Sequence, residues 1–160
     1  MKRLLAGFAL AGATLAFTII STSGSAAPPR DRSFTLIQRN SEEQFSLVDN
    51  PPRTLDDNHL TPGDLATLHQ PLRRVSGRQV GAADVGCTAT RGGTFNHVRF
   101  ACDGVYTLKR GTLMVEIRFL PNSQPTIAIT GGTGAYEGAS GSIRQVSRPH
   151  HELLFVHLLA

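Results

Sequence analysis

The chain has 160 residues, of which 16 are basic, 12 are acidic and two are cysteines, and it contains no tryptophan. This length suits a single domain with a core of its own. The basic residues are scattered along the chain and stacking aromatics are few, so the composition argues against nucleic-acid binding. We therefore interpret the charges as a solvated surface.

Residues 1–27 have the layout of a secretory signal peptide. Two basic residues precede an apolar run over residues 4–20, and small residues lead up to Ala27. An uncleaved anchor is the alternative, although a membrane helix needs about 20 apolar residues and usually anchors at its far end. Cleavage after Ala27 would leave residues 28–160 as one secreted, extracellular domain with no further membrane contact.

The rest of the chain consists of short strand-like runs separated by turns that contain glycine or proline. Residues 50–62, rich in proline, are expected to form a loop. No stretch keeps helical periodicity. The predicted strands cover residues 33–38, 45–49, 65–74, 79–90, 98–109, 112–120, 126–130, 141–147 and 152–159. This pattern predicts an all-β fold, a closed antiparallel barrel of about eight strands with a long N-terminal loop.

The glycine-rich stretch over residues 126–143 joins two strand-like runs. A phosphate-binding loop would need a following lysine or a helix, and the glycines and serines here would break such a helix. Glycines at positions 131, 132, 134 and 138 instead favour a tight corner of a small barrel.

A two-residue turn at Lys109 and Arg110 would fix the register of the strands on either side. One face of this hairpin is then apolar, with pairs Leu108 and Gly111, Tyr106 and Leu113, Gly104 and Val115, Cys102 and Ile117, and Phe100 and Phe119. The other face sets Asp103 opposite Glu116, near Arg118. Two opposed carboxylates would suit acid–base chemistry, whereas neutralisation by Arg118 on a wet outer face is the competing interpretation.

The two cysteines flank a predicted turn near Thr94. Cys87 and Cys102 would lie opposite each other on neighbouring strands, which favours a disulfide in an exported protein, with two buried free thiols as the alternative. The six histidines show no ligand spacing around the cysteines. We therefore predict neither a metal site nor a cofactor.

Three sequence pieces resemble the allene oxide cyclase-like barrels, which are related in fold to plant dirigent proteins. They are Gly63-Asp64-Leu65, the run from Val80-Gly81 to Val85-Gly86-Cys87, and the run from Gly111 to Val115 that leads to residues 127–138. The resemblance spans about residues 63–159. It implies an eight-stranded antiparallel barrel, often a homotrimer, with a ligand cavity inside. Positions similar to the cavity residues of the plant proteins are Ala66, Leu68, Gln70, Cys87 and Phe119.

The activity of the plant cyclases is not expected to carry over. Their first strand supplies a Glu and an Asn, and the matching places here hold Thr35 and Ile37, so that acid is missing. Gln70 could hold a water in place of a cavity Asn, but an amide cannot do the proton chemistry of a carboxylate. Glu42 and Glu43 lie just beyond the first strand, either as solvated loop charges or at a barrel mouth.

We therefore predict a secreted barrel that binds a hydrophobic small molecule in its lumen and steers its cyclisation or isomerisation without a strong catalytic acid. Enzymatic activity, if present, would be that of an isomerase or cyclase. A non-enzymatic scaffold with a filled lumen is the alternative, and a Ser-His-Asp hydrolase is disfavoured because no nucleophile-elbow pattern occurs. The predicted ligand-binding residues are Ala66, Leu68, Gln70, Phe100, Tyr106, Leu113, Val115, Ile117 and Phe119.

Overall fold

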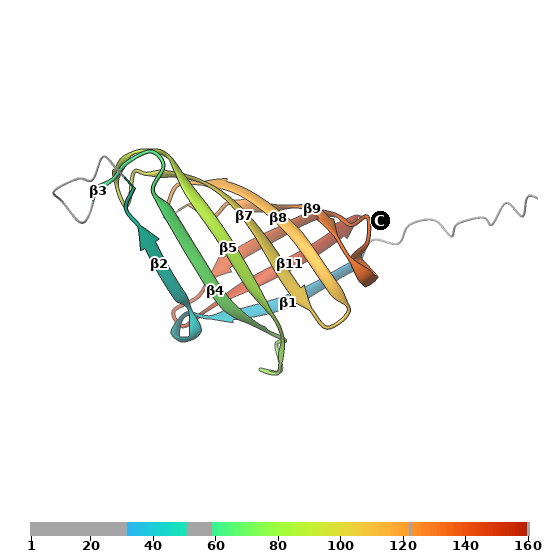
Figure 1. The fold of residues 1–160 in the computed structure, drawn as a ribbon. Helices are drawn as coiled ribbons and strands as arrows, with labels where there is room; N and C mark the ends of the chain where they lie inside the picture. Colours follow the sequence, from blue (N-terminus) through green and yellow to red (C-terminus); the bar gives the residue numbers. More distant parts are fainter. Residues whose placement is uncertain (1–31, 51–58, 122, 160) are drawn as a thin grey trace, which may run out of the picture.

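The structure, a computed structural model, describes residues 32–50, 59–121 and 123–159, and the predicted signal peptide lies outside these residues. Eight antiparallel strands close into a barrel (Figure 1). Within the described residues no helix has the length and apolar character needed to cross a bilayer. The barrel strands are β1 (Arg32–Arg39), β4 (Leu65–Arg73), β5 (Gln79–Arg91), β7 (Arg99–Leu108), β8 (Gly111–Phe119), β9 (Thr126–Gly132), β10 (Ser140–Ser147) and β11 (His151–Leu159).

The predicted fold class and the predicted strands are confirmed, with ends that differ by at most two residues. The predicted loop over residues 50–62 is partly wrong, because β3 (His59–Leu60) pairs with β6 (Gly93–Thr94). Leu60 is buried, and its burial explains why these two residues leave the loop and form a ladder. Residues 51–58 lie outside the described residues.

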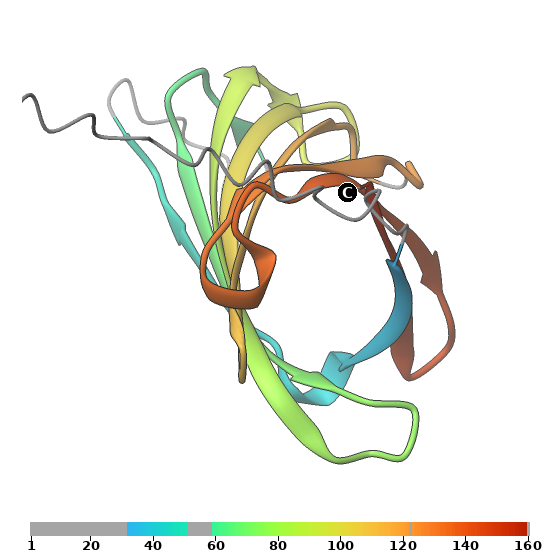
Figure 2. The same cartoon turned by 90° about the vertical axis from the view of Figure 1, so that its right-hand side faces the viewer.

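The barrel closes where the first strand meets β4. Strands follow one another around the ring as β1, β11, β10, β9, β8, β7, β5 and β4, and Figure 2 shows them encircling a common axis. β1 pairs along its whole length with β11 but meets β4 only at Ile37 and Arg73. The other half of β4 pairs with β2 (Gln44–Val48), an edge strand outside the ring.

A bidentate ion pair lies beside this seam. A short 3₁₀ turn (Asn40–Glu42) follows β1, and Arg73 donates from Nε and Nη2 to the two carboxylate oxygens of Glu42 at 2.8 and 2.7 Å. The neighbouring Arg73 guanidinium lowers the pKa of the Glu42 carboxyl through these hydrogen bonds, although partial burial opposes the shift. The two-point contact fixes the chain where the ring has its sparsest ladder.

The β7–β8 hairpin has the register predicted from its two-residue turn. Tyr106 pairs with Leu113, Cys102 with Ile117 and Phe100 with Phe119. The opposite face carries Asp103 and Glu116, both exposed, with Arg118 3.9 Å from Glu116. The structure thus supports a neutralised outer face and not an acid–base pair at this position.

The glycine-rich stretch forms the predicted corner, built from the end of β9 and a 3₁₀ turn (Gly134–Tyr136) that packs against the β7–β8 hairpin. Gly134 has a φ of +61°. A Cβ on Gly111, whose φ is +143°, would lie 2.0 Å from the carbonyl oxygen of Thr133. Glycine is needed at both positions because any side chain would prevent this close approach.

The side chains inside the barrel form two separate cores. The larger core fills one half of the lumen with Leu36, Leu72, Leu113, Ile143 and Leu154, all of them nearly or fully buried. The smaller core gathers Leu60, Val98 and Phe100 where β3 and β6 cover an end of the barrel. Part of the lumen between these cores stays unfilled.

Candidate functional site

A cavity of about 410 Å³ occupies the part of the lumen that neither core fills. Seven of the nine predicted ligand-binding residues line it, namely Ala66, Leu68, Gln70, Tyr106, Val115, Ile117 and Phe119. The remaining two, Phe100 and Leu113, lie outside its lining. Phe100 packs in the smaller core, with its ring 5.8 Å from that of Phe119, and Leu113 is fully buried in the larger core. Ligand contact at the other seven positions stays a prediction.

Strands β5, β7, β8 and β9 supply an apolar wall. Inward positions alternate along each strand, so Val85, Val115, Ile117 and Ile127 all face the cavity. Gly104 lies among them, and a Cβ there would come within 2.8 Å of Val85 Cγ2. The missing side chain at this position leaves room for the cavity.

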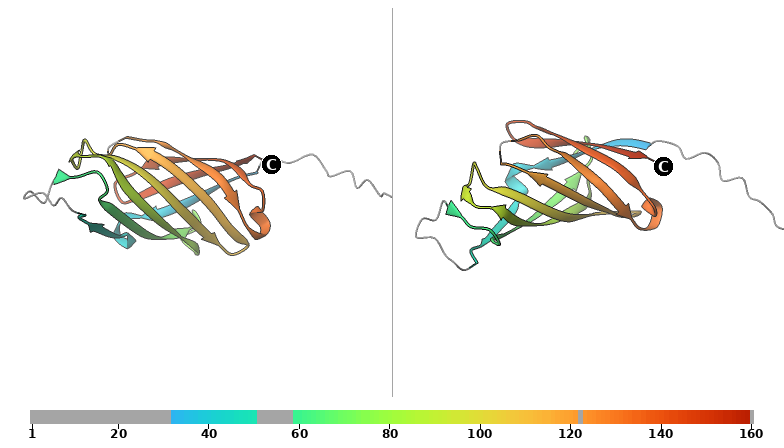
Figure 3. Two further views of the ribbon diagram at one scale, coloured as in Figure 1. Left: turned by 45° about the horizontal axis from the view of Figure 1, so that its top comes forward. Right: turned by 90° about the horizontal axis from the view of Figure 1, so that it is seen from above.

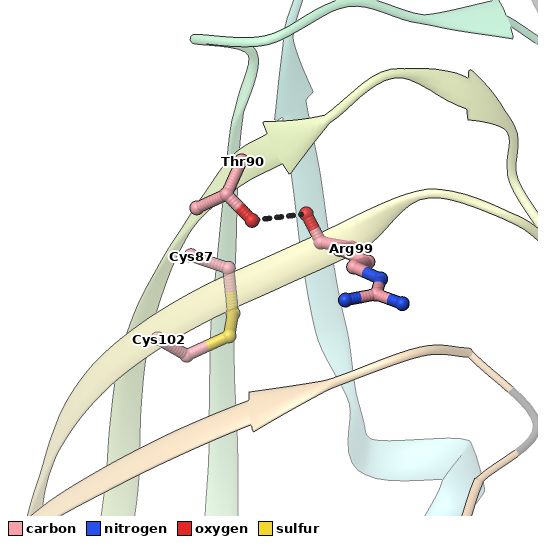
Figure 4. Close-up of a disulfide and its surroundings, with 4 residues drawn as sticks. All are labelled: Cys87, Thr90, Arg99 and Cys102. Carbon is pink, nitrogen blue, oxygen red and sulfur yellow. Dashed lines mark hydrogen bonds between the residues drawn. A yellow bond between two sulfur atoms is a disulfide. The ribbon is translucent and has the colours of Figure 1, made fainter.

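The predicted disulfide between Cys87 and Cys102 is present and forms part of the same wall (Figure 4). The two cysteines are directly opposite in the β5–β7 ladder. Close to them, Thr90 Oγ1 donates a 3.2 Å hydrogen bond to the carbonyl oxygen of Arg99. The bond ties together the two strands that carry much of the apolar wall.

Strands β1, β10 and β11 supply a polar wall, which we define as Gln38, Gln145, Ser147 and Glu152. These strands lie across the barrel from β5 and β7 (Figure 3). Glu152 is the central residue, because it pairs with Gln38 on one side and with Ser147 on the other. Gln70 of β4 adds an amide, which donates to the carbonyl oxygen of Arg39 at 3.1 Å. The lumen therefore has two chemically different sides.

The carboxyl group of Glu152 is held within the polar wall. Gln145 Nε2 donates to its Oε2, and Ser147 Oγ donates to its Oε1 at 3.3 Å. Burial raises the pKa of Glu152, the Ser147 hydrogen bond lowers it, and the nearby carboxylate of Glu43 raises it further. The net shift is upward, so Glu152 keeps a proton to higher pH than an ordinary glutamate does.

The hydroxyl group of Tyr106 reaches the cavity from the apolar wall. Tyr106 is 3 % exposed, and within the described part of the chain its hydroxyl makes no hydrogen bond. Every fully buried polar side-chain atom of the described residues has a partner, so this hydroxyl must be open to the cavity. Burial, and to a smaller extent the charge of Glu152, raises its pKa well above the usual range. Tyr106 therefore stays a neutral donor and acceptor.

Sequence reasoning placed the wrong first-strand residues in the lumen and missed the carboxyl group. Leu36 and Gln38 face inward, whereas Thr35 and Ile37, the positions matched through the resemblance, fall on the other face of the strand. The lumen does contain an acid, Glu152, which comes from the last strand. The only sequence signal was its place in the inward alternation that continues through Leu154 and residues 156 and 158.

The two acidic residues after β1 have different surroundings. Glu43 lines the cavity, as expected for a residue at a barrel mouth, whereas Glu42 is engaged by Arg73 outside it. Sequence alone left both roles open for both residues. The backbone of the 3₁₀ turn separates them, since it ends at Glu42 and β2 begins one residue after Glu43.

The arrangement can enclose a small molecule, orient it between unlike walls and exchange a proton with it at Glu152. A cavity of this size falls within the range of small-molecule sites, which is about 300 to 1,000 Å³. Among the residues that the structure describes, no group of three or more His, Cys, Asp or Glu side chains is placed to hold a metal ion.

The fold and the cavity together define a class, that of closed eight-stranded β-barrels with a ligand-sized lumen. No model of a known protein family matches the sequence, and no curated protein matches it. Solved structures do match. A pyocyanin demethylase is 24% identical with a TM-score of 0.59, the match covering 78% of this chain and 100% of that one.

Two further solved structures share the fold of the chain. A pterocarpan synthase dirigent protein is 16% identical with a TM-score of 0.61, covering 83% of this chain and 86% of its own. AbnU, an exo-specific intermolecular Diels-Alderase, is 12% identical with a TM-score of 0.58, covering 84% of this chain and 100% of its own. At these identities the matches show a shared fold, which confirms the predicted resemblance to dirigent proteins at the level of fold.

Proposed function

We propose that this protein is a secreted barrel that encloses a small, largely apolar molecule in its lumen and steers the cyclisation or isomerisation of that molecule. The observation that carries the proposal is the cavity of about 410 Å³ between the two cores. A completely filled lumen would have favoured a non-enzymatic scaffold. Side chains fill only the half of the lumen that the larger core occupies. The fold shared with a dirigent protein and a Diels-Alderase supports the same direction.

Confinement is the main source of rate enhancement in this proposal. A flexible substrate held in one folded conformation has its reacting atoms close together, and such preorganisation can lower a barrier by several kcal/mol, up to about 7 to 11 in well-oriented cases. The apolar wall presents rigid surfaces, because Val115 and Ile127 are anchored in the larger core. This contribution does not require a proton transfer.

Glu152 adds a second contribution that the sequence did not suggest. Burial raises the pKa of Glu152, which makes its carboxylate a stronger base than that of an ordinary glutamate, and this carboxylate can accept a proton from a substrate N–H or O–H group. Tyr106 offers a further hydrogen bond from the opposite wall. A substrate that loses a proton to Glu152 while negative charge develops on an oxygen near Tyr106 would use both groups.

The proposal is tested by asking what the purified exported protein retains. Protein incubated with a hydrophobic extract of its own culture is re-purified, and bound compounds are identified by mass spectrometry. We expect a specific small molecule, which after longer incubation turns into a product of identical mass and different retention time, because cyclisation and isomerisation conserve composition.

Two further measurements test the expected processing and assembly. N-terminal sequencing of the exported protein should begin at residue 28, and sedimentation checks the homotrimer that the resemblance implies.

A matched pair of variants shows whether the lumen is responsible. Ile117→Phe adds bulk inside the cavity, whereas Met114→Phe adds the same ring on the outer face of the same strand, where Met114 is exposed. Retention should fall only for Ile117→Phe. Equal retention by both variants, or no bound compound on the wild-type protein, would reject the proposed function.

A further inference from the structure

Within the described part of the chain, the ionisable side chains that line the lumen include two carboxyl groups and no basic group. Glu43 and Glu152 are the charged residues that line the cavity, and among the described residues no lysine, arginine or histidine does so. Nor does any basic side chain of the described residues form an ion pair with Glu152. A carboxylate removed from water without a cation gains more from a positively charged ligand than a solvated one does.

Two arginines of the barrel strands have partners outside the cavity. Arg73 is bound to Glu42 outside the cavity. The guanidinium of Arg144 lies 4.4 Å from the ring centre of Phe155, and both residues are exposed on the outside of the barrel. Neither arginine lines the cavity, so the fold leaves the charge of the polar wall available to a ligand.

Two polar side chains that face the cavity have no hydrogen-bond partner among the described residues. Gln38 is 4 % exposed, and its side chain makes no hydrogen bond within the described part of the chain. The hydroxyl of Tyr106 is in the same position, as described above. Since buried polar groups are normally hydrogen-bonded, these atoms need partners that a ligand or water must supply. Gln38 lies directly beside Glu152 in the β1–β11 ladder, so its free amide adds to the same wall.

We propose that the lumen selects molecules with an apolar body and a cationic or N–H-donating end, and that it rejects carboxylates and phosphates. The donating end lies against Glu152 and Gln38, and the apolar body lies against Val115, Ile117 and Phe119. The inference rests on the proposed function, because it names the substrate class of the same cavity. The proposed selectivity excludes fatty acids and other apolar anions, which the apolar wall alone would accept.

The test compares three probes that share a naphthalene body and differ in their polar end, on the purified exported protein. They are 2-naphthylmethylamine, which is a cation at neutral pH, the uncharged 2-naphthylmethanol, and the anion 2-naphthoate. Isothermal titration calorimetry at low salt gives the dissociation constant of each. We expect the amine to bind at least about tenfold more tightly than the carboxylate, with the alcohol between them.

Variants assign the selectivity to the polar wall. Glu152→Gln keeps the shape of the side chain and removes its charge, and combining it with Glu43→Gln removes the second charge. The ratio of amine to carboxylate affinity should fall toward one in the double variant. Glu116→Gln removes an equivalent charge from the exposed outer face of β8 and should leave the ratio unchanged.

The outcomes separate the two proposals. Binding of the alcohol with equal affinities for amine and carboxylate overturns the charge selectivity and leaves the apolar-ligand function standing. A selectivity that persists in the double variant also overturns it. Failure of all three probes to bind rejects the proposed function, and the charge selectivity fails with it. A thermal melt of each variant confirms that it is folded.

Discussion

Two truncations on the same face of β8 should differ sharply in their effect on stability. Leu113 is fully buried in the larger core, whereas Ile117, two inward positions further along, borders the cavity. Replacing either residue by alanine removes three carbon atoms. The comparison therefore measures whether the lumen is empty at one position and filled at the other.

The structure sets the expected magnitudes. For Leu113→Ala, the lost transfer free energy of three buried carbons is about 2.4 kcal/mol, and the void left in a packed core brings the total to about 3 to 4 kcal/mol. For Ile117→Ala the space beside the side chain is already open and the side chain is only partly buried, so we expect about 1 to 2 kcal/mol.

Urea unfolding of both variants and the wild type, analysed by linear extrapolation, gives the free energy of unfolding. Similar slopes with denaturant concentration would show that the comparison is sound. If Ile117→Ala destabilised the protein as much as Leu113→Ala did, Ile117 would be packed on all sides. That result would refute the open lumen and with it the basis of the proposed function.

Three further predictions concern single groups. Burial raises the pKa of Glu152 above its ordinary value of 4.5, so the contribution of this residue to folding stability is fully present below that pH and is lost as the pH rises through the raised pKa. In urea unfolding, Glu152→Gln should therefore gain stability relative to the wild type between pH 4 and pH 7. A difference in the free energy of unfolding that stays constant over this range would contradict the prediction. Replacing both Cys87 and Cys102 by alanine should cost about 3 kcal/mol, given the 15-residue separation, and a reducing agent should then have no further effect on the thermal melt. Asp64 is buried, and although burial raises its pKa, the hydrogen bonds from the backbone N–H groups of Thr61 and Asn50 lower it more. Asp64→Ala should lower the free energy of unfolding by about 2 to 4 kcal/mol at pH 7 and by less in acid, where the carboxylate becomes protonated. An equal loss at pH 3 would show that the negative charge of Asp64 does not contribute to stability.

Local rules were sufficient for the β7–β8 hairpin and for the disulfide. A two-residue turn leaves a single register, so the pairing of Tyr106 with Leu113 and of Cys102 with Ile117 followed from the sequence. The opposed position of Cys87 followed from the spacing around a turn. Each of these inferences required only residues that are near one another along the chain.

The polar wall could not be derived in this way. β1 and β11 lie at opposite ends of the described chain, and the register that sets Gln38 beside Glu152 depends on the closure of the whole ring. A shift of one residue would have exchanged the inward and outward faces of β1, which is the error made at Thr35 and Ile37. The resemblance gave the fold without this register.

The sequence by itself determined the alternation of apolar and polar residues, the tight corners at glycine and the cysteine pair, and hence a stapled all-β barrel. The tertiary structure alone decided which part of the lumen stays open. Leu113 and Ile117 share a strand and a face, and nothing local distinguishes them. Their different surroundings arise because residues from distant strands fill the space around Leu113, while Gly104 and the short side chain of Ala66 leave space near Ile117.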